Sequence, residues 1–173
     1  GLPSYGFCGC VDSKMPDAQA GAEAAMHALT GALAGVNLIH DCGFAGGGDL
    51  ALMEMAVICD DINAIAARIA AGIEVNDETL ALDVIRKVGP GGQYLSQKHT
   101  LKFFEKEIFV PKIFDRWSTQ TWIEAGAKDI GQAARERVKK ILKEHYPAPL
   151  PKDVQQKLAD RVRQAEKELL AKE

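Results

Sequence analysis

The first 72 residues of the sequence contain few basic side chains. Only Lys14 and Arg68 occur there, against eight aspartates and glutamates, although the whole chain has a net charge of only −3. This balance argues against nucleic acid as a ligand, because phosphate binding requires clustered Lys and Arg. The acidic charge is compatible with a cationic ligand, and a solvated acidic surface explains it equally.

Long apolar runs are also lacking. No stretch approaches the roughly 18–20 consecutive apolar residues of a membrane span, and no signal peptide opens the chain. We therefore expect a cytoplasmic protein that has no membrane partner. The chain begins with Gly1 and has no initiator methionine, which suggests a processed product or a fragment of a longer polypeptide.

Strand and helix signals alternate over the first 72 residues. Residues 1–10 predict a buried strand that ends in a Gly-rich turn, and residues 17–35 predict a helix. A second strand is predicted over residues 36–41, and a second helix over 50–71 with Asp49 as its N-cap. This order is typical of a parallel sheet covered by helices.

The first predicted helix is rich in Ala and Gly, which permits close packing against the sheet. The polar segment VDSK (residues 11–14) lies between the first strand and this helix. Because α/β folds place their sites at the carboxyl ends of parallel strands, the VDSK loop lies on the expected functional side.

The alternation stops at Ile73, and the rest of the chain predicts mainly helices. A helix is capped by Asn76 or Asp77, and helices near residues 128–146 and 154–169 carry apolar stripes. We divide the chain into a partial barrel segment over residues 1–118 and a C-terminal helical tail over 119–173. The tail helices are expected to pack on the outer layer of the barrel.

Two parallel strands do not form a stable sheet alone. A complete (β/α)8 barrel needs roughly 250 residues, and this chain has 173. We therefore predict an α/β fold that is the C-terminal portion of a (β/α)8 TIM barrel with additional C-terminal helices. The missing N-terminal half of the barrel is then an expected partner.

One block of residues matches a known family pattern. Residues 12–23 follow the pattern D-S-K-x-x-D-x-Q-A-G-x-E, and His40, Asp41 and Gly43 follow the pattern H-D-x-G. Together with the downstream segment FDRWSTQTWIEAG, these residues resemble the C-terminal barrel segment of the trimethylamine methyltransferase (MttB-like) superfamily. Val11 departs from the Ser or Thr that usually precedes the first pattern.

The resemblance implies a TIM-barrel enzyme that moves a methyl group from a methylated amine to the Co(I) of a separate corrinoid protein. No cofactor is expected on this chain itself, since that partner carries the cobalamin. Members with pyrrolysine carry it near residues 8–11, where this sequence has only standard residues. The resemblance therefore points to the non-pyrrolysine branch, whose substrates are quaternary amines such as glycine betaine.

A quaternary amine leaves without needing a proton, so no catalytic acid is expected, and we assign no catalytic residue. The site must orient the cation against aromatic rings or carboxylates and hold any substrate carboxylate with a polar group. The candidate substrate-binding residues are His40, Asp41, Asp12, Lys14 and Phe44. A structural histidine is the alternative for His40, and a loop salt bridge is the alternative for Asp12 with Lys14.

Aromatic residues are scarce, at 6% of the chain. Near the expected site they are limited to Tyr5, Phe7 and Phe44, which are too few to enclose a cation. The missing half of the barrel must then supply the rest of the cage.

Cysteine supports a rival hypothesis. All four cysteines lie in the first 60 residues, and free thiols are expected because the chain does not look secreted. Cys8, Cys10, His40 and Cys42 have side chains that bind zinc, although C-x-C is not the usual spacing and small packed thiols explain the cysteines equally.

A second rival is a non-catalytic barrel fragment or docking module that forms homo-oligomers through open sheet edges. The acidic residues Glu54, Asp60 and Asp61 of the second predicted helix are expected to be solvated or to face the tail.

Overall fold

The computed structural model describes residues 2–7 and 9–170, and its first two strands form a parallel pair. Strand β1 (Tyr5–Phe7) pairs with β2 (Leu38–His40), and Tyr5 lies opposite Leu38. Helix α1 (Ala18–Leu33) connects the two strands. The predicted strand-helix-strand order and the parallel pairing are confirmed, and the chain is an α/β protein. Its assignment to part of a barrel stays a prediction.

Helix α1 begins and ends where its sequence predicts. The Asp17 side chain caps it by accepting a hydrogen bond from the Ala20 backbone N–H at 2.9 Å. Gly35 follows the helix with a φ of 74°, which only glycine adopts without strain. The buried positions of α1 are Ala20, Ala24 and Ala28, so its inner face has almost no side chain and its neighbours approach closely.

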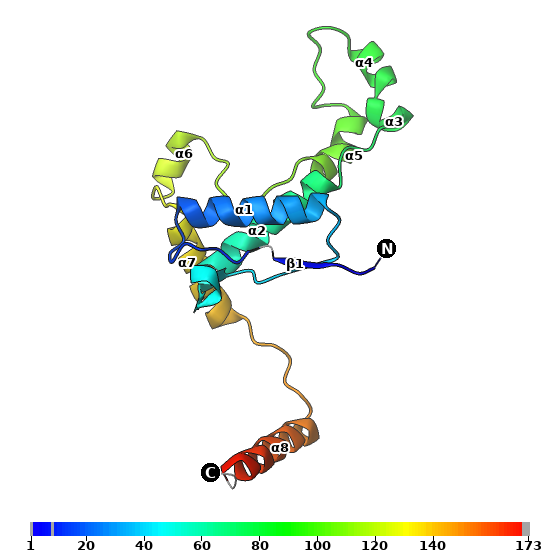
Figure 1. The fold of residues 1–173 in the computed structure, drawn as a ribbon. Helices are drawn as coiled ribbons and strands as arrows, with labels where there is room; N and C mark the ends of the chain where they lie inside the picture. The colour runs from blue at the N-terminus through cyan, green and yellow to red at the C-terminus, as the bar shows by residue number, and fades with distance from the viewer. Residues whose placement is uncertain (1, 8, 171–173) are drawn as a thin grey trace. The chain divides into compact units, whose positions relative to one another are not determined.

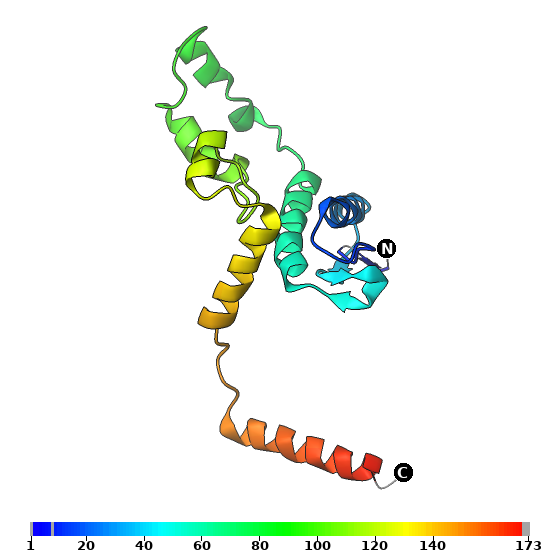
Figure 2. The ribbon, with the colours of Figure 1, turned by 90° about the vertical axis from the view of Figure 1, so that its left-hand side faces the viewer.

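Helix α2 (Met53–Ala70) supplies the large core residues that α1 lacks. It lies beside α1 and β1 runs along α1 (Figures 1 and 2). Met55, Ile58 and Ile62 are buried, between 1% and 5% exposed. The pairing of small residues on one helix with large residues on the other fills the core of this region.

The segment between β2 and α2 differs from the prediction. Strands β3 (Phe44–Ala45) and β4 (Leu50–Ala51) form an antiparallel hairpin around the 3₁₀ turn Gly46–Gly48. Asp49 therefore lies in the hairpin and is not an N-cap, and Leu52 occupies that position. The three glycines all have positive φ, which closes the hairpin and delays the start of the helix.

The face of the sheet that points away from the helices is exposed. Tyr5 and Phe7 are each 65% exposed and Leu38 is 57% exposed, whereas Ile39 packs against the core on the other face. The prediction that β1 is a buried strand is therefore wrong for this chain. The reason is that the described residues cover only one face of a two-stranded sheet.

Residues 73–145, all of which the structure describes, contain five further helices. They are α3 (Asp77–Leu80), α4 (Leu82–Val88), α5 (Lys98–Glu107), α6 (Thr119–Glu124) and α7 (Ile130–Glu144). Asn76 caps α3 in a capping box with Thr79, as its position predicts. Ala81 divides this single predicted helix into α3 and α4, because its φ is 53°, in the left-handed region.

The chain divides into two compact units, residues 1–139 and residues 140–173. Helix α8 (Lys152–Leu170) lies in the second unit. It confirms the helix that the apolar stripe over residues 154–169 predicts. The boundary predicted after residue 118 and the packing of the tail on a barrel stay predictions. No helix in the described ranges is both long and apolar enough to cross a membrane.

Candidate functional site

The VDSK loop follows β1 and is bonded to the hairpin that follows β2. The Val11 N–H donates to the Phe44 carbonyl at 3.1 Å, and the Gly47 N–H donates to the Val11 carbonyl at 3.1 Å. The Gly46 N–H donates to the Ser13 carbonyl at 3.0 Å. These bonds hold the two loops together beyond the carboxyl ends of β1 and β2.

Helix α1 fixes the shape of the VDSK loop through Glu23. The Glu23 carboxylate accepts hydrogen bonds from the backbone N–H groups of Asp12 at 2.7 Å and Ser13 at 3.4 Å. It also accepts one from the Gln19 side chain at 2.7 Å. The bond from Gln19 and then the two backbone bonds lower the pKa of Glu23, because they stabilise the ionised form.

Asp17 performs a similar role at the start of α1. Its carboxylate accepts hydrogen bonds from the Ala20 N–H and from the Ser13 hydroxyl, each at 2.9 Å, and these bonds lower its pKa. Ser13, Asp17, Gln19 and Glu23 of the matched block therefore organise the loop. The role of Glu23 was not predicted from the sequence, because its carboxylate bonds the backbone of the preceding loop and not the first turn of its own helix.

Asp12 and Lys14 do not form the predicted loop salt bridge. The Lys14 Nζ instead donates to the backbone carbonyl of Asp12 at 2.8 Å. Both side chains are exposed, so their contact with a ligand stays a prediction.

His40, the last residue of β2, is the centre of an aromatic cluster on the exposed face of the sheet. Its ring stacks on Tyr5 with 3.8 Å between the centroids, and the Phe7 ring lies at 4.8 Å. Its Nδ1 lies 2.8 Å from Asp41 Oδ1. The Nε2 atom is buried and has no hydrogen-bond partner among the residues that the structure describes.

The structure brings the other candidate residues to the same end of the sheet. The Phe44 backbone links the two loops, because its N–H donates to the Asp41 carbonyl at 3.2 Å and its carbonyl accepts from Val11. Burial and then the negative charges of Asp41 and Asp12 raise the pKa of the Cys10 thiol. Both carboxylates therefore lie close enough to Cys10 to oppose the ionisation of its thiol.

The described residues do not support the zinc hypothesis. Cys10 and Cys59 are free thiols, and Cys8 lies outside the described residues. Within residues 2–7 and 9–170, no three His, Cys, Asp or Glu side chains are placed to hold a metal ion.

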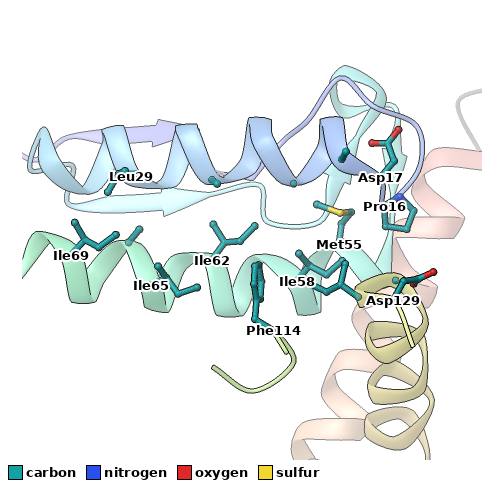
Figure 3. A pocket seen from close by; sticks show the side chains of 16 residues that line it. Pro16, Asp17, Leu29, Met55, Ile58, Ile62, Ile65, Ile69, Phe114 and Asp129 are labelled. Carbon is teal, nitrogen blue, oxygen red and sulfur yellow. The ribbon is translucent and has the colours of Figure 1, made fainter. Parts of the chain in front are cut away.

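A groove of about 650 Å³ lies elsewhere, between α1 and α2. Leu29, Ile62 and Ile69 line it and Phe114 points into it, while the carboxylates of Asp17 and Asp129 lie at one end (Figure 3). None of the five candidate residues takes part. Its walls are almost entirely apolar, so it is unsuited to a charged amine, and the region around His40 remains the better candidate site.

A sequence profile of the trimethylamine methyltransferase (MTTB) family matches residues 1–169. The chain belongs to the trimethylamine methyltransferase family. The family resemblance carried by residues 12–23 and 40–43 is therefore confirmed.

Individual members of the trimethylamine methyltransferase family match most of this chain. Trimethylamine methyltransferase MttB of Methanosarcina barkeri is 39% identical over 154 residues, which are 89% of this chain and 31% of that protein. The same enzyme of Desulfitobacterium hafniense (strain DSM 10664 / DCB-2) is 37% identical, over 96% of this chain and 34% of that protein. A glycine betaine methyltransferase of Desulfitobacterium hafniense (strain Y51) is 34% identical, over 98% of this chain and 35% of that protein. The chain thus spans about a third of the length of the curated relatives it matches.

Proposed function

We propose that the protein containing this chain is a methyltransferase that moves a methyl group from a quaternary amine, glycine betaine being the leading case, to the Co(I) of a separate corrinoid protein. The observation that carries the proposal is the cluster of aromatic rings and carboxylates around His40. Family membership supports the class of reaction, and the glycine betaine methyltransferase among the relatives supports the substrate. The standard residues at positions 8–11 support the non-pyrrolysine branch.

The chemistry demands little acid or base catalysis from this chain. The C–N bond breaks with its electron pair left on the amine, and the Co(I) of the partner supplies the pair for the new bond to carbon. A neutral tertiary amine leaves, so no proton is transferred. The chain's own residues must bind and orient the methyl donor.

The groups around His40 suit the two ends of a betaine. The exposed rings of Tyr5 and Phe7 offer faces to the trimethylammonium group, and the Asp12 and Asp41 carboxylates add negative charge nearby. Because a carboxylate only accepts hydrogen bonds, His40 bonds the substrate carboxylate by donating from Nε2 while its Nδ1 donates to Asp41. Because one sheet face supplies few rings, the rest of the polypeptide completes the cage.

The test is the His40→Phe variant of the full-length enzyme beside His40→Ala. Phenylalanine keeps a ring against Tyr5 and removes both nitrogens. Each variant is expected to lose roughly ten- to a hundredfold in kcat/KM for betaine, because a hydrogen bond to a charged group contributes about 1.5–3 kcal/mol. The assay follows methylation of the Co(I) corrinoid protein.

The control is Asp60→Asn, which removes an exposed ion pair between α2 and Lys112 and should change turnover little. Circular dichroism should show wild-type folding in all three variants. Normal betaine turnover by His40→Phe would show that the imidazole nitrogens do not contact the substrate.

A further inference from the structure

Asp41 has an unusual backbone conformation for a residue with a side chain. Its φ is 65°, in the left-handed region, where Asp and Asn are tolerated better than most residues. Its carbonyl accepts the Phe44 N–H that closes the turn after β2. Such strain persists only where the surroundings fix it, and it is concentrated at functional sites.

This conformation turns the Asp41 carboxylate back onto the preceding residue. Oδ1 of Asp41 lies 2.8 Å from Nδ1 of His40, and the two side chains are 29% and 18% exposed. A carboxylate accepts hydrogen bonds and donates none, so the proton of this bond belongs to Nδ1. The carboxylate therefore faces the imidazole, which is its partner in the described chain.

The remaining contacts of His40 fix the plane of its ring. Tyr5 stacks at 3.8 Å with an interplanar angle of 13°, and Phe7 lies at 4.8 Å with an angle of 44°. With Nδ1 bonded to Asp41, Nε2 is left as the free functional atom, and it is buried without a partner among the described residues. Buried ring nitrogens are rarely left unbonded, which makes Nε2 the atom that awaits a ligand.

We propose that Asp41 is a positioning residue that acts through His40, holding the ring by its Nδ1–H so that the Nε2–H points at the substrate carboxylate, and that it does not contact the substrate itself. This inference rests on the proposed function only for its substrate. It revises the sequence-based role of Asp41, which placed that carboxylate directly against the ligand.

Two substitutions at position 41 separate the side chain from the backbone. Asp41→Gly tolerates the left-handed conformation but removes the acceptor. Asp41→Asn also tolerates it and keeps an oxygen that accepts from Nδ1. Both variants are therefore expected to fold, and only the glycine variant should release the ring.

The first measurement is ¹⁵N NMR of full-length enzyme labelled at histidine, with His40 assigned by its loss in His40→Phe. Wild type and Asp41→Asn should show a protonated Nδ1, whereas Asp41→Gly should show loss or averaging of that signal. A protonated Nδ1 retained in Asp41→Gly would overturn the proposal. This readout needs no turnover, so it decides the role of Asp41 even if betaine is not the substrate.

The second measurement is kcat/KM for betaine. The kcat/KM of Asp41→Gly should fall roughly ten- to a hundredfold, as that of His40→Phe does. The kcat/KM of Asp41→Asn should stay within about threefold of wild type. Asp41→Gly combined with His40→Phe should lose no more than His40→Phe alone, because Asp41 acts through the imidazole. Losses that multiply in the double variant would show an independent contact with the substrate and overturn the proposal.

Discussion

Asp61 is a charged residue in the core of the larger unit, only 1% exposed. Its carboxylate accepts hydrogen bonds from the backbone N–H groups of Lys112 at 2.9 Å, Ile113 at 2.7 Å and Phe114 at 3.1 Å. Three donors compensate the burial of one charge. The result is that a distant segment is attached to α2 and Phe114 is held over the groove between α1 and α2.

Asp61→Asn should destabilise the protein strongly. The amide NH₂ cannot accept a hydrogen bond, so at least one buried backbone N–H loses its partner. We expect a loss of about 2–4 kcal/mol in the free energy of unfolding, measured by urea denaturation. The matched control is Asp60→Asn, which breaks an exposed ion pair with Lys112 and should cost about 0–1 kcal/mol. Equal losses in the two variants would contradict this assignment.

The acidic residues of α2 show what the sequence reveals about single positions. Glu54 pairs with Arg135 of the predicted tail and the Asp60 side chain is exposed, so the expectation that these two residues face the tail or are solvated is confirmed. The same expectation is wrong for Asp61, which is buried. The deep burial of Asp61 was not predictable, because its three donors lie more than 50 residues away and are backbone atoms that any sequence carries. The Asp41 bond to His40 was missed for a similar reason, since a left-handed φ is not visible in the sequence.

At the level of elements, the sequence predicts those with local signals. The helix start near Asp17, the Ala-rich face of α1 and a helix cap at Asn76 or Asp77 depend on local sequence, and the structure confirms all three, with Asn76 as the cap. The prediction failed at Asp49, where a good capping residue is used in a hairpin instead. Three consecutive glycines removed the helical preference there, and long-range bonds to the VDSK loop fixed the alternative.

The attachment of the VDSK loop to α1 should depend on pH. The folded-state pKa of Glu23 is lowered, so its contribution is fully present above the unfolded pKa of about 4.3 and is lost as pH falls through the folded value. Glu23→Gln does not titrate and loses part of the bonding at every pH. The Tm of this variant should therefore lie below that of wild type at pH 7, and the difference should shrink toward pH 3.

The control for this prediction is Glu105→Gln, which removes a carboxylate from the exposed surface of α5. It corrects for the change in net charge. A Tm difference for Glu23→Gln that stays constant from pH 7 to pH 3 would show that the carboxylate does not hold the loop in its ionised form.

For the molecule as a whole, the sheet of β1 and β2 governs how the chain associates. In the described residues, one face of this sheet is exposed and the outer edge of each of its two strands is unpaired. Such surfaces promote association. We expect the isolated 173-residue chain to self-associate in size-exclusion chromatography with light scattering. Phe7→Lys should reduce association, whereas Leu101→Lys, at an exposed apolar site on α5, should not. A monomer whose strand amides resist hydrogen exchange would contradict the prediction that the chain is part of a larger barrel.

The parallel pairing of β1 with β2 also sets an order of events in time. Residues on the two strands that face each other are 33 positions apart, as in the bond between Ser4 and Asn37. At a synthesis rate of about 5–20 residues per second, β1 waits roughly two to seven seconds for its partner to be made. A helix such as α1 forms in about a microsecond, so α1 is complete long before the strand pair that it connects.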